Sequence, residues 1–265
     1  MWRKIYGSTF KKTEDKPGMH IYFRSVYSKE YKATLGYESK LYLVDESEGI
    51  LMPESYMPIA ELSNQCVELV IWQVEAICRL MEGFDRKNME YDWIAVDASV
   101  TAIDKIDFAD KVISKIKENK VNPTKFAIAL PVNILEQQSQ NIKDNIAKFK
   151  ENEVSIIVNG FGVMYSAVMD LCNIDADYCV IDESLADYIN GSKKEQKMYE
   201  NLAKMIKDMD IEPISDGLDK KVITDAWMEN DFTLIGTGNK FGKWFSEDEL
   251  EVDRRRVRYG ELDRK

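Results

Sequence analysis

Acidic side chains recur where the predicted strands of this chain end, and they are the groups best suited to chemistry. Asp97 ends one apolar run, and Asp182 directly follows another. Asp216 and Asp219 follow a third run, and Glu38 lies near the middle of an earlier one. The ends of parallel strands meet at one edge of a sheet, so we expect these acids to converge. Because hard divalent cations prefer oxygen ligands, converging carboxylates predict a cation site.

The same acids also have a structural interpretation. A short acidic side chain after a strand often caps the next helix by accepting a hydrogen bond from a backbone N–H. Asp182 and Asp219 are placed to act in this way. Capping and cation binding therefore both stay open for these residues.

The run at residues 154–158 is β-branched on both faces and continues into Asn159 and Gly160. A run that is apolar on both faces is typical of a parallel sheet covered by helices. The residues just past such a strand are where catalytic groups usually lie in α/β enzymes. Neither Asn159 nor Gly160 can carry a charge, so this position cannot supply a carboxylate.

Strands and helices alternate along most of the chain. We predict strands at residues 20–27, 35–44, 93–97, 125–130, 154–158, 178–181, 211–215 and 233–235. We predict helices at residues 64–83, 107–119, 134–152, 165–171, 193–209, 220–229 and 247–256, and a short helix or loop at 53–62. The first two strands are too close in sequence for a helical crossover, so they pair antiparallel. Eight strands favour an α/β, TIM-barrel-like (β/α)8 fold with one antiparallel strand; an open doubly wound sheet is the alternative.

One domain accounts for the chain. We expect a tail at residues 1–18, the barrel at 19–250 and a charged tail at 251–265, which contains a basic run at 254–258. Asn64 is predicted to cap the helix that begins there.

Composition excludes several classes of function. The chain has 265 residues and a net charge of −11, which disfavours binding to the phosphates of nucleic acid. No apolar run is long enough to span a membrane, and the amino terminus lacks the apolar core of a signal peptide, so we expect a cytoplasmic protein. His20 is the only histidine, which leaves no imidazoles for a triad or a zinc site. The four cysteines have no metal-binding spacing and are expected in the core, in a reducing compartment.

The ordered motifs resemble the EAL domain, a bacterial phosphodiesterase module that hydrolyses cyclic diguanylate. The signature Glu-Ala-Leu appears as Glu38-Ser39-Lys40. Further matches are Pro58-Ile59-Ala60-Glu61, Ala76-Ile77-Cys78, Val96-Asp97-Ala98-Ser99, Asn159-Gly160-Phe161-Gly162, Val180-Ile181-Asp182, Ser215-Asp216-Gly217-Leu218-Asp219 and Ile235-Gly236. The resemblance spans about residues 20 to 250 and implies the EAL barrel.

The resemblance covers the scaffold rather than the catalytic set. Active EAL domains use several carboxylates and an Asn to hold two divalent metals that activate a water. The family's Glu, Asp-Asp pair, Lys and Gln are replaced here by Ala129, Asn159 with Gly160, Val180 and Ile235. Its Asn and a further Glu are replaced by Asp97 and Asp216, whereas Glu38 is unchanged. The resemblance therefore implies a vestigial site at the barrel mouth, without metal or other cofactor, formed by Glu38, Asp97, Asn159, Asp182, Asp216 and Asp219.

We expect an inactive EAL-like domain, a pseudoenzyme that acts as a regulatory module in cyclic diguanylate signalling and binds another protein. One alternative is a receptor that binds cyclic diguanylate or a related nucleotide without hydrolysis, with Arg24 on a phosphate and Tyr42 stacked on guanine. Arg24 could equally pair with Glu38 or Asp97, and Tyr42 could pack at the mouth. A third alternative is an enzyme with different chemistry built on Glu38, Asp97 and Asp216, with one metal.

A homodimer is a further alternative. Active relatives dimerise through the loop and helix after the fifth strand, and residues 161–165 have lost the family's Thr and Gly in that loop.

Overall fold

The computed structural model describes residues 18–45, 47–86, 90–137, 139–163 and 168–246. Eight strands close into a barrel in the order β1-β2-β4-β5-β6-β7-β8-β9, and β9 pairs back to β1. They are β1 (Gly18–Ser28), β2 (Ala33–Asp45), β4 (Trp93–Asp97), β5 (Phe126–Pro131), β6 (Ser155–Phe161), β7 (Tyr178–Ile181), β8 (Glu212–Ser215) and β9 (Ile235–Thr237). β1 is antiparallel to both of its barrel neighbours, and the other barrel pairs are parallel. The predicted barrel with one antiparallel strand is confirmed.

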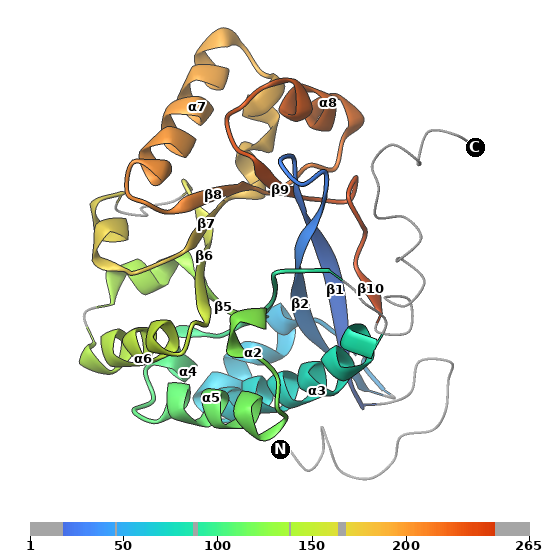
Figure 1. Cartoon of the computed structure of the whole chain (residues 1–265), viewed down its shortest axis with the longest axis vertical. Helices are drawn as coiled ribbons and strands as arrows, with labels where there is room; N and C mark the ends of the chain where they lie inside the picture. Colours follow the sequence, from blue (N-terminus) through green and yellow to red (C-terminus); the bar gives the residue numbers. More distant parts are fainter. Residues whose placement is uncertain (1–17, 46, 87–89, 138, 164–167, 247–265) are drawn as a thin grey trace.

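Helices cover the outside of the barrel. The α-helices are α2 (Pro53–Leu62), α3 (Cys66–Arg86), α4 (Val100–Ile103), α5 (Phe108–Glu118), α6 (Gln140–Glu151), α7 (Lys193–Lys207) and α8 (Lys221–Glu229). The 3-10 helices are η1 (Pro123–Lys125), η2 (Val132–Glu136), η3 (Val168–Asn173) and η4 (Glu183–Asn190). In Figure 1, α3, α5 and α6 lie along the lower side of the barrel and α7 and α8 along the upper side.

The barrel wall separates two apolar layers. Alternate residues of the strands, such as Val26, Ile157 and Ile214, form a cluster inside the barrel. The residues between them, such as Ile128 and Val158, belong to a larger cluster with the surrounding helices. Strands buried on both faces read as continuous apolar runs, which is why the sequence shows no alternation in β5 or β7.

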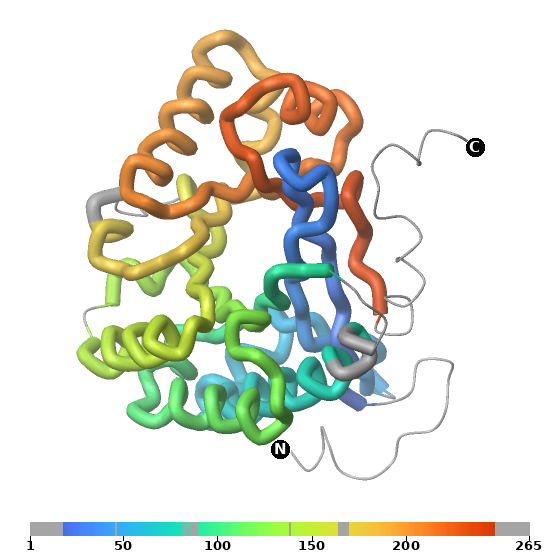
Figure 2. Tube along the Cα trace, viewed as in Figure 1, coloured from blue at the N-terminus to red at the C-terminus, as the bar shows by residue number. Residues whose placement is uncertain are grey.

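β1 and β2 are the longest strands and extend beyond the barrel. β2 pairs with β4 over residues 36–39, whereas its pairing with β1 reaches Val44. Two short strands extend this hairpin: β3 (Gly49–Leu51) pairs with the carboxyl end of β2, and β10 (Phe245–Ser246) pairs with the middle of β1. We call this four-stranded antiparallel extension, β10-β1-β2-β3, the wing. Figure 2 shows the last described segment, in red, beside the blue β1–β2 hairpin.

The predicted cap at Asn64 is wrong. Helix α3 begins at Cys66, and Asn64 has a φ of 54°. Its N–H donates to the carbonyl of Glu61, and the N–H of Gln65 donates to that of Ala60. This is the pattern that closes the carboxyl end of a helix, and Asn tolerates the left-handed conformation it needs. Asn64 therefore ends α2 instead of starting α3.

Other differences concern short or 3-10 segments. The helix predicted at residues 134–152 is two elements, η2 and α6, and the described part of the one predicted at 165–171 is the 3-10 helix η3. Helix α4 and strands β3 and β10 were not predicted, because two to four residues are too few for a period to show. Cys172 is exposed, contrary to expectation, whereas Cys66, Cys78 and Cys179 are buried.

Some predictions fall outside the described residues. They are the helix at 247–256, the tail at 251–265 and the tail at 1–18 except Gly18, which begins β1. In the part of the chain that the structure describes, no helix combines the length and the apolar character needed to cross a bilayer.

Candidate functional site at the barrel mouth

Arg24 lies at the centre of the mouth and joins three strands. It is the register partner of Glu38 across the β1–β2 pair. Its Nε is 2.5 Å from Glu38 Oε2, and its Nη2 is 2.9 Å from Asp216 Oδ2, just past β8. The three side chains are only 12%, 18% and 16% exposed, so this is a largely buried ion triad. The alternative in which Arg24 pairs with Glu38 is confirmed.

Local backbone geometry positions Asp216. The N–H of Gly217 donates to Asp216 Oδ1 at 2.6 Å. Gly217 has a φ of 78°, and a Cβ there would lie 2.8 Å from the carbonyl oxygen of Glu183. Glycine is therefore needed at this turn, because both the conformation and the close backbone approach exclude a side chain.

Burial and charge act against each other in the triad. Burial raises the pKa of Asp216 to about 6, although Arg24 lowers it. Burial disfavours the charged form of Arg24, but the Glu38 and Asp216 carboxylates outweigh this effect and raise the pKa of the guanidinium. The guanidinium therefore favours the charged form of the Asp216 carboxylate, whereas burial favours its neutral form.

Asp97 lies at the end of β4, in register with Ala129 of β5. Burial raises its pKa to about 6; Lys40 lowers it, and Glu38 and Glu54 raise it. Among the described residues no hydrogen bond to its carboxylate is found. Glu38 is thus close enough to raise the pKa of both Asp97 and Asp216.

The other predicted site residues have separate structural roles. Asp182 caps η4 and accepts a hydrogen bond from the N–H of Ser184 at 3.0 Å, which bears out its capping interpretation. Asp219 does not cap α8; it accepts from the N–H of Asn239 at 2.7 Å and so ties the loops after β8 and β9 together. Asn159 is half-buried beside a bulge in the β6–β7 pair.

Aromatic and basic side chains lie above the triad on the wing. The rings of Tyr22 and Tyr42 are 4.7 Å apart between centroids. Trp244, next to β10, has the Arg24 guanidinium 5.2 Å from its ring centre and the Lys40 ammonium 5.1 Å away. We call Tyr22, Tyr42 and Trp244 the aromatic shelf. Sequence reasoning missed Trp244, and its only local signal was the aromatic pair formed with Phe245 after the last strand.

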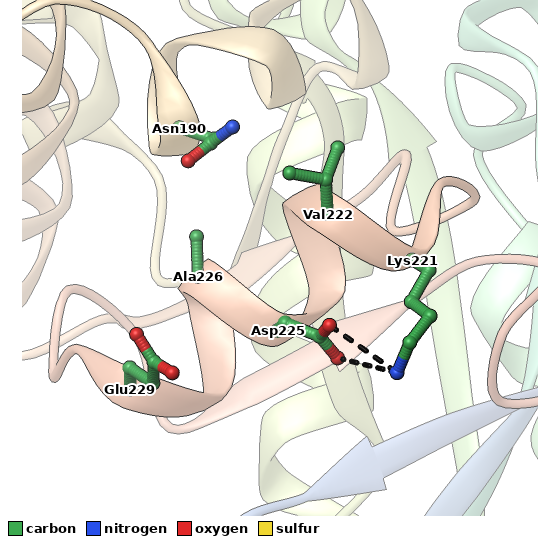
Figure 3. Close-up of a pocket in the computed structure, with 6 residues that line it drawn as sticks. All are labelled: Asn190, Lys221, Val222, Asp225, Ala226 and Glu229. Carbon is green, nitrogen blue, oxygen red and sulfur yellow. Dashed lines mark hydrogen bonds and ion pairs between the residues drawn. The ribbon is translucent and has the colours of Figure 1, made fainter.

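A separate pocket of about 420 Å³ lies on the outside of the barrel, between η4 and α8 (Figure 3). It is lined by Asn190, Lys221, Val222, Asp225, Ala226 and Glu229. Lys221 and Asp225 form an ion pair of 3.3 Å across one turn of α8. None of the predicted site residues lines this pocket.

The EAL domain family matches residues 11–235. The chain belongs to the EAL domain family. It is 22% identical over 190 residues to the probable cyclic di-GMP phosphodiesterase PdeG of Escherichia coli. The match covers 70% of this chain and 37% of that protein. It is 20% identical over 172 residues to an uncharacterized protein of Mycobacterium tuberculosis, covering 64% of this chain and 28% of that protein. The chain thus spans well under half the length of these relatives.

Solved EAL structures share the fold. The FimX EAL domain from Pseudomonas aeruginosa, bound to c-di-GMP, superposes with a TM-score of 0.76 at 12% identity. The match covers 87% of this chain and 91% of that one.

Three positions that the resemblance matched to polar residues of active EAL domains are apolar and buried in this barrel. Ala129, Val180 and Ile235 are 4%, 5% and 8% exposed and belong to the cluster inside the barrel. They pack with residues such as Val26 and Ile214. The inside of the barrel therefore offers no polar group at these positions.

The mouth does not fit the two divalent metals of active EAL domains. Within the described ranges, no three His, Cys, Asp or Glu side chains are grouped closely enough to hold an ion. Glu38 and Asp216 are already bonded to a guanidinium. Mg²⁺ needs near-octahedral oxygen ligands, and two carboxylates held by Arg24 do not supply that set.

Proposed function

We propose that this EAL domain does not hydrolyse cyclic diguanylate and acts as a regulatory, protein-binding module of bacterial signalling in the cytoplasm. The observation that carries the proposal is the Arg24 triad, which uses two of the remaining carboxylates in ion pairs. Two-metal hydrolysis needs enough ligand charge to hold cations about 3.5–4 Å apart. Ala129, Asn159 and Gly160 supply none of that charge.

Exposed apolar side chains support a role in protein binding. Ile50, Met52, Ile59 and Leu62 lie on or beside β3 and α2 and are 51%, 47%, 41% and 88% exposed. β3 is also an edge strand of the wing. Exposed apolar groups beside an unpaired strand edge are typical of protein-interaction surfaces.

A turnover assay tests the loss of hydrolysis. The purified chain is incubated with cyclic diguanylate and Mg²⁺ or Mn²⁺, and linear products are separated and measured, with an active EAL phosphodiesterase as the positive control. We expect no product above the protein-free reaction. Metal-dependent turnover that E38Q abolishes would show that the proposal is wrong.

A capture experiment tests the binding surface. The native chain and the double variant I59D/L62D are used as bait in cell extract, and bound proteins are compared by mass spectrometry. We expect the native chain to retain a protein that the variant loses, while circular dichroism shows equal folding. Identical captured sets would remove β3 and α2 as the interface.

A receptor for cyclic diguanylate is the second candidate, and the aromatic shelf favours it. Rings such as Tyr42 and Trp244 can stack on guanine, and Lys40 is placed to meet a phosphate. Calorimetry with the dinucleotide, comparing the native chain with Y42A, tests this candidate. Heat that Y42A loses supports it, and the absence of heat at high micromolar concentration ends it.

A further inference from the structure

We propose that the Arg24 guanidinium is a built-in cation that takes the place of a divalent metal between Glu38 and Asp216, so that the mouth is closed to metals. The inference deepens the proposed function and rests on it. It concerns what neutralises the remaining carboxylates, whereas the proposed function concerns turnover.

The contacts of the guanidinium match this role. Nε binds Glu38 and Nη2 binds Asp216, so one delocalised cation bridges two acids from strands on opposite sides of β1 and β9. Thr237 of β9 adds a longer hydrogen bond to the same Glu38 oxygen at 3.4 Å. A divalent cation that used both carboxylates would have to displace Arg24 from two charge-assisted hydrogen bonds.

The surrounding side chains hold the Arg24 guanidinium between Glu38 and Asp216. Its backbone is fixed by pairing between β1 and β2, and the residue two positions on, Val26, lies in the apolar cluster inside the barrel. Above it the Trp244 ring lies over the guanidinium, and Trp244 is held by the pairing of β10 with β1. Turning inward would bury the charge among apolar groups such as Ile235, and turning away from the acids would lose the contact with the indole as well as both ion pairs.

Asp97, the remaining acid of the mouth, does not make up for Glu38 and Asp216 as a metal ligand. Asp97 lies in the electrostatic reach of Lys40, so the mouth has a second resident cation near its third carboxylate. Lys40 also lies 3.8 Å from Glu54 and under the Trp244 ring. Arg24 therefore pairs with two acids of the mouth, and Lys40 lowers the pKa of the third, Asp97.

Manganese binding tests the inference, because Mn²⁺ relaxes water protons differently when it is free and when it is protein-bound. The proteins are the native chain, R24Q, R24Q/D216N and R79Q, in which an exposed arginine of α3 is replaced as the matched control. Glutamine keeps a polar side chain of similar shape at position 24 but carries no charge. We expect the native chain and R79Q to bind no Mn²⁺ at the mouth. R24Q should bind Mn²⁺ at least tenfold more tightly than the native chain does. The added D216N should remove this gain.

Each result of the manganese measurement leads to a different conclusion. Mn²⁺ binding by the native chain that E38Q or D216N abolishes would overturn the inference, and this measurement stands even if circular dichroism shows that R24Q does not fold. A folded R24Q that gains no site would overturn it as well. Mn²⁺ binding without turnover would overturn the inference alone, whereas metal-dependent turnover would contradict the proposed function as well, so the two failures are distinguishable.

Discussion

Arg24 sets the charge balance of the mouth at the level of single residues. A buried ion pair contributes little net stability, but removing one partner leaves the other charge unpaired and costs about 3–5 kcal/mol. In this chain the loss of Arg24 would leave two such charges, Glu38 and Asp216. We therefore expect the triad to tolerate simultaneous replacement better than replacement of Arg24 alone.

The pH dependence of stability tests Asp97. Its folded-state pKa is about 6, above the ordinary value of 3.8, mainly through burial. Between these values the folded chain binds more protons than the unfolded chain, so stability falls as pH rises from about 4 to 6. D97N removes this loss and should stabilise the protein by about 1–3 kcal/mol at pH 7, with little gain near pH 4. Urea unfolding at several pH values measures the difference.

The control for that prediction is D208N, which removes an exposed acid at the end of α7. It should leave the slope of stability against pH close to that of the native chain. Asp216 also has a raised pKa, so D97N should reduce the slope and not abolish it. A D97N slope equal to the native one would contradict the assignment.

The sequence predicted which acidic residues lie at the site, but it did not predict all of the side chains that contact them. Glu38, Asp97 and Asp216 were predicted to converge; Glu38 and Asp216 meet on Arg24, and Asp97 lies within the electrostatic reach of Glu38. The contact of Arg24 with Asp216 spans 192 positions of the chain and exists only because the barrel closes. No local pattern encodes such a contact, and the same reason explains why Trp244 was missed.

At the scale of elements, the pairing of β2 with β4 requires glycine at position 36, because a side chain there would clash with Trp93. A Cβ on Gly36 would lie 2.6 Å from the backbone oxygen of Trp93 and 2.9 Å from its ring. Both strands would have to move apart beside the triad. G36A should therefore lower the free energy of unfolding by about 2–3 kcal/mol, measured by urea denaturation.

G49A is the matched control for G36A. Gly49 is exposed, and nothing lies within 4 Å of a Cβ built on it, but its φ of 75° is left-handed. The substitution should cost only about 1 kcal/mol, from backbone strain alone. Equal losses in the two variants would mean that the close approach at Gly36 is unimportant.

The sequence predicted long elements well and short ones poorly. β-branched runs such as residues 154–158 fixed the parallel strands, because burial on both faces demands them. The apolar spacing at 134–152 was read as one helix, yet Val132–Glu136 is a separate 3-10 helix. Apolar periodicity over five residues does not distinguish the two helix types, whose periods are about 3.0 and 3.6.

At the scale of the whole molecule, closure joins the two ends of the barrel sequence. Residues 26–28 of β1 pair with residues 235–237 of β9. A chain ending at residue 234 lacks this pairing and exposes the edge of β8. We expect it to lose the single cooperative transition in thermal unfolding followed by circular dichroism.

A chain ending at residue 246 is the control, since it keeps β9 and β10. It should unfold in one cooperative transition. If the chain ending at 234 unfolded just as cooperatively, β9 would not be needed for closure, and the barrel would be stable with a gap beside β1.

The strands of the barrel end at different levels at the mouth, so the two sides of the mouth differ. Six residues of β2, from 40 to 45, continue past the last pair with β4, a rise of about 20 Å at about 3.3 Å per residue. The strands across from it, β7 and β8, stop at Ile181 and Ser215 and have no such continuation. A molecule bound at the mouth would therefore meet the aromatic shelf and Lys40 on the β2 side and no such strand extension on the β7 and β8 side.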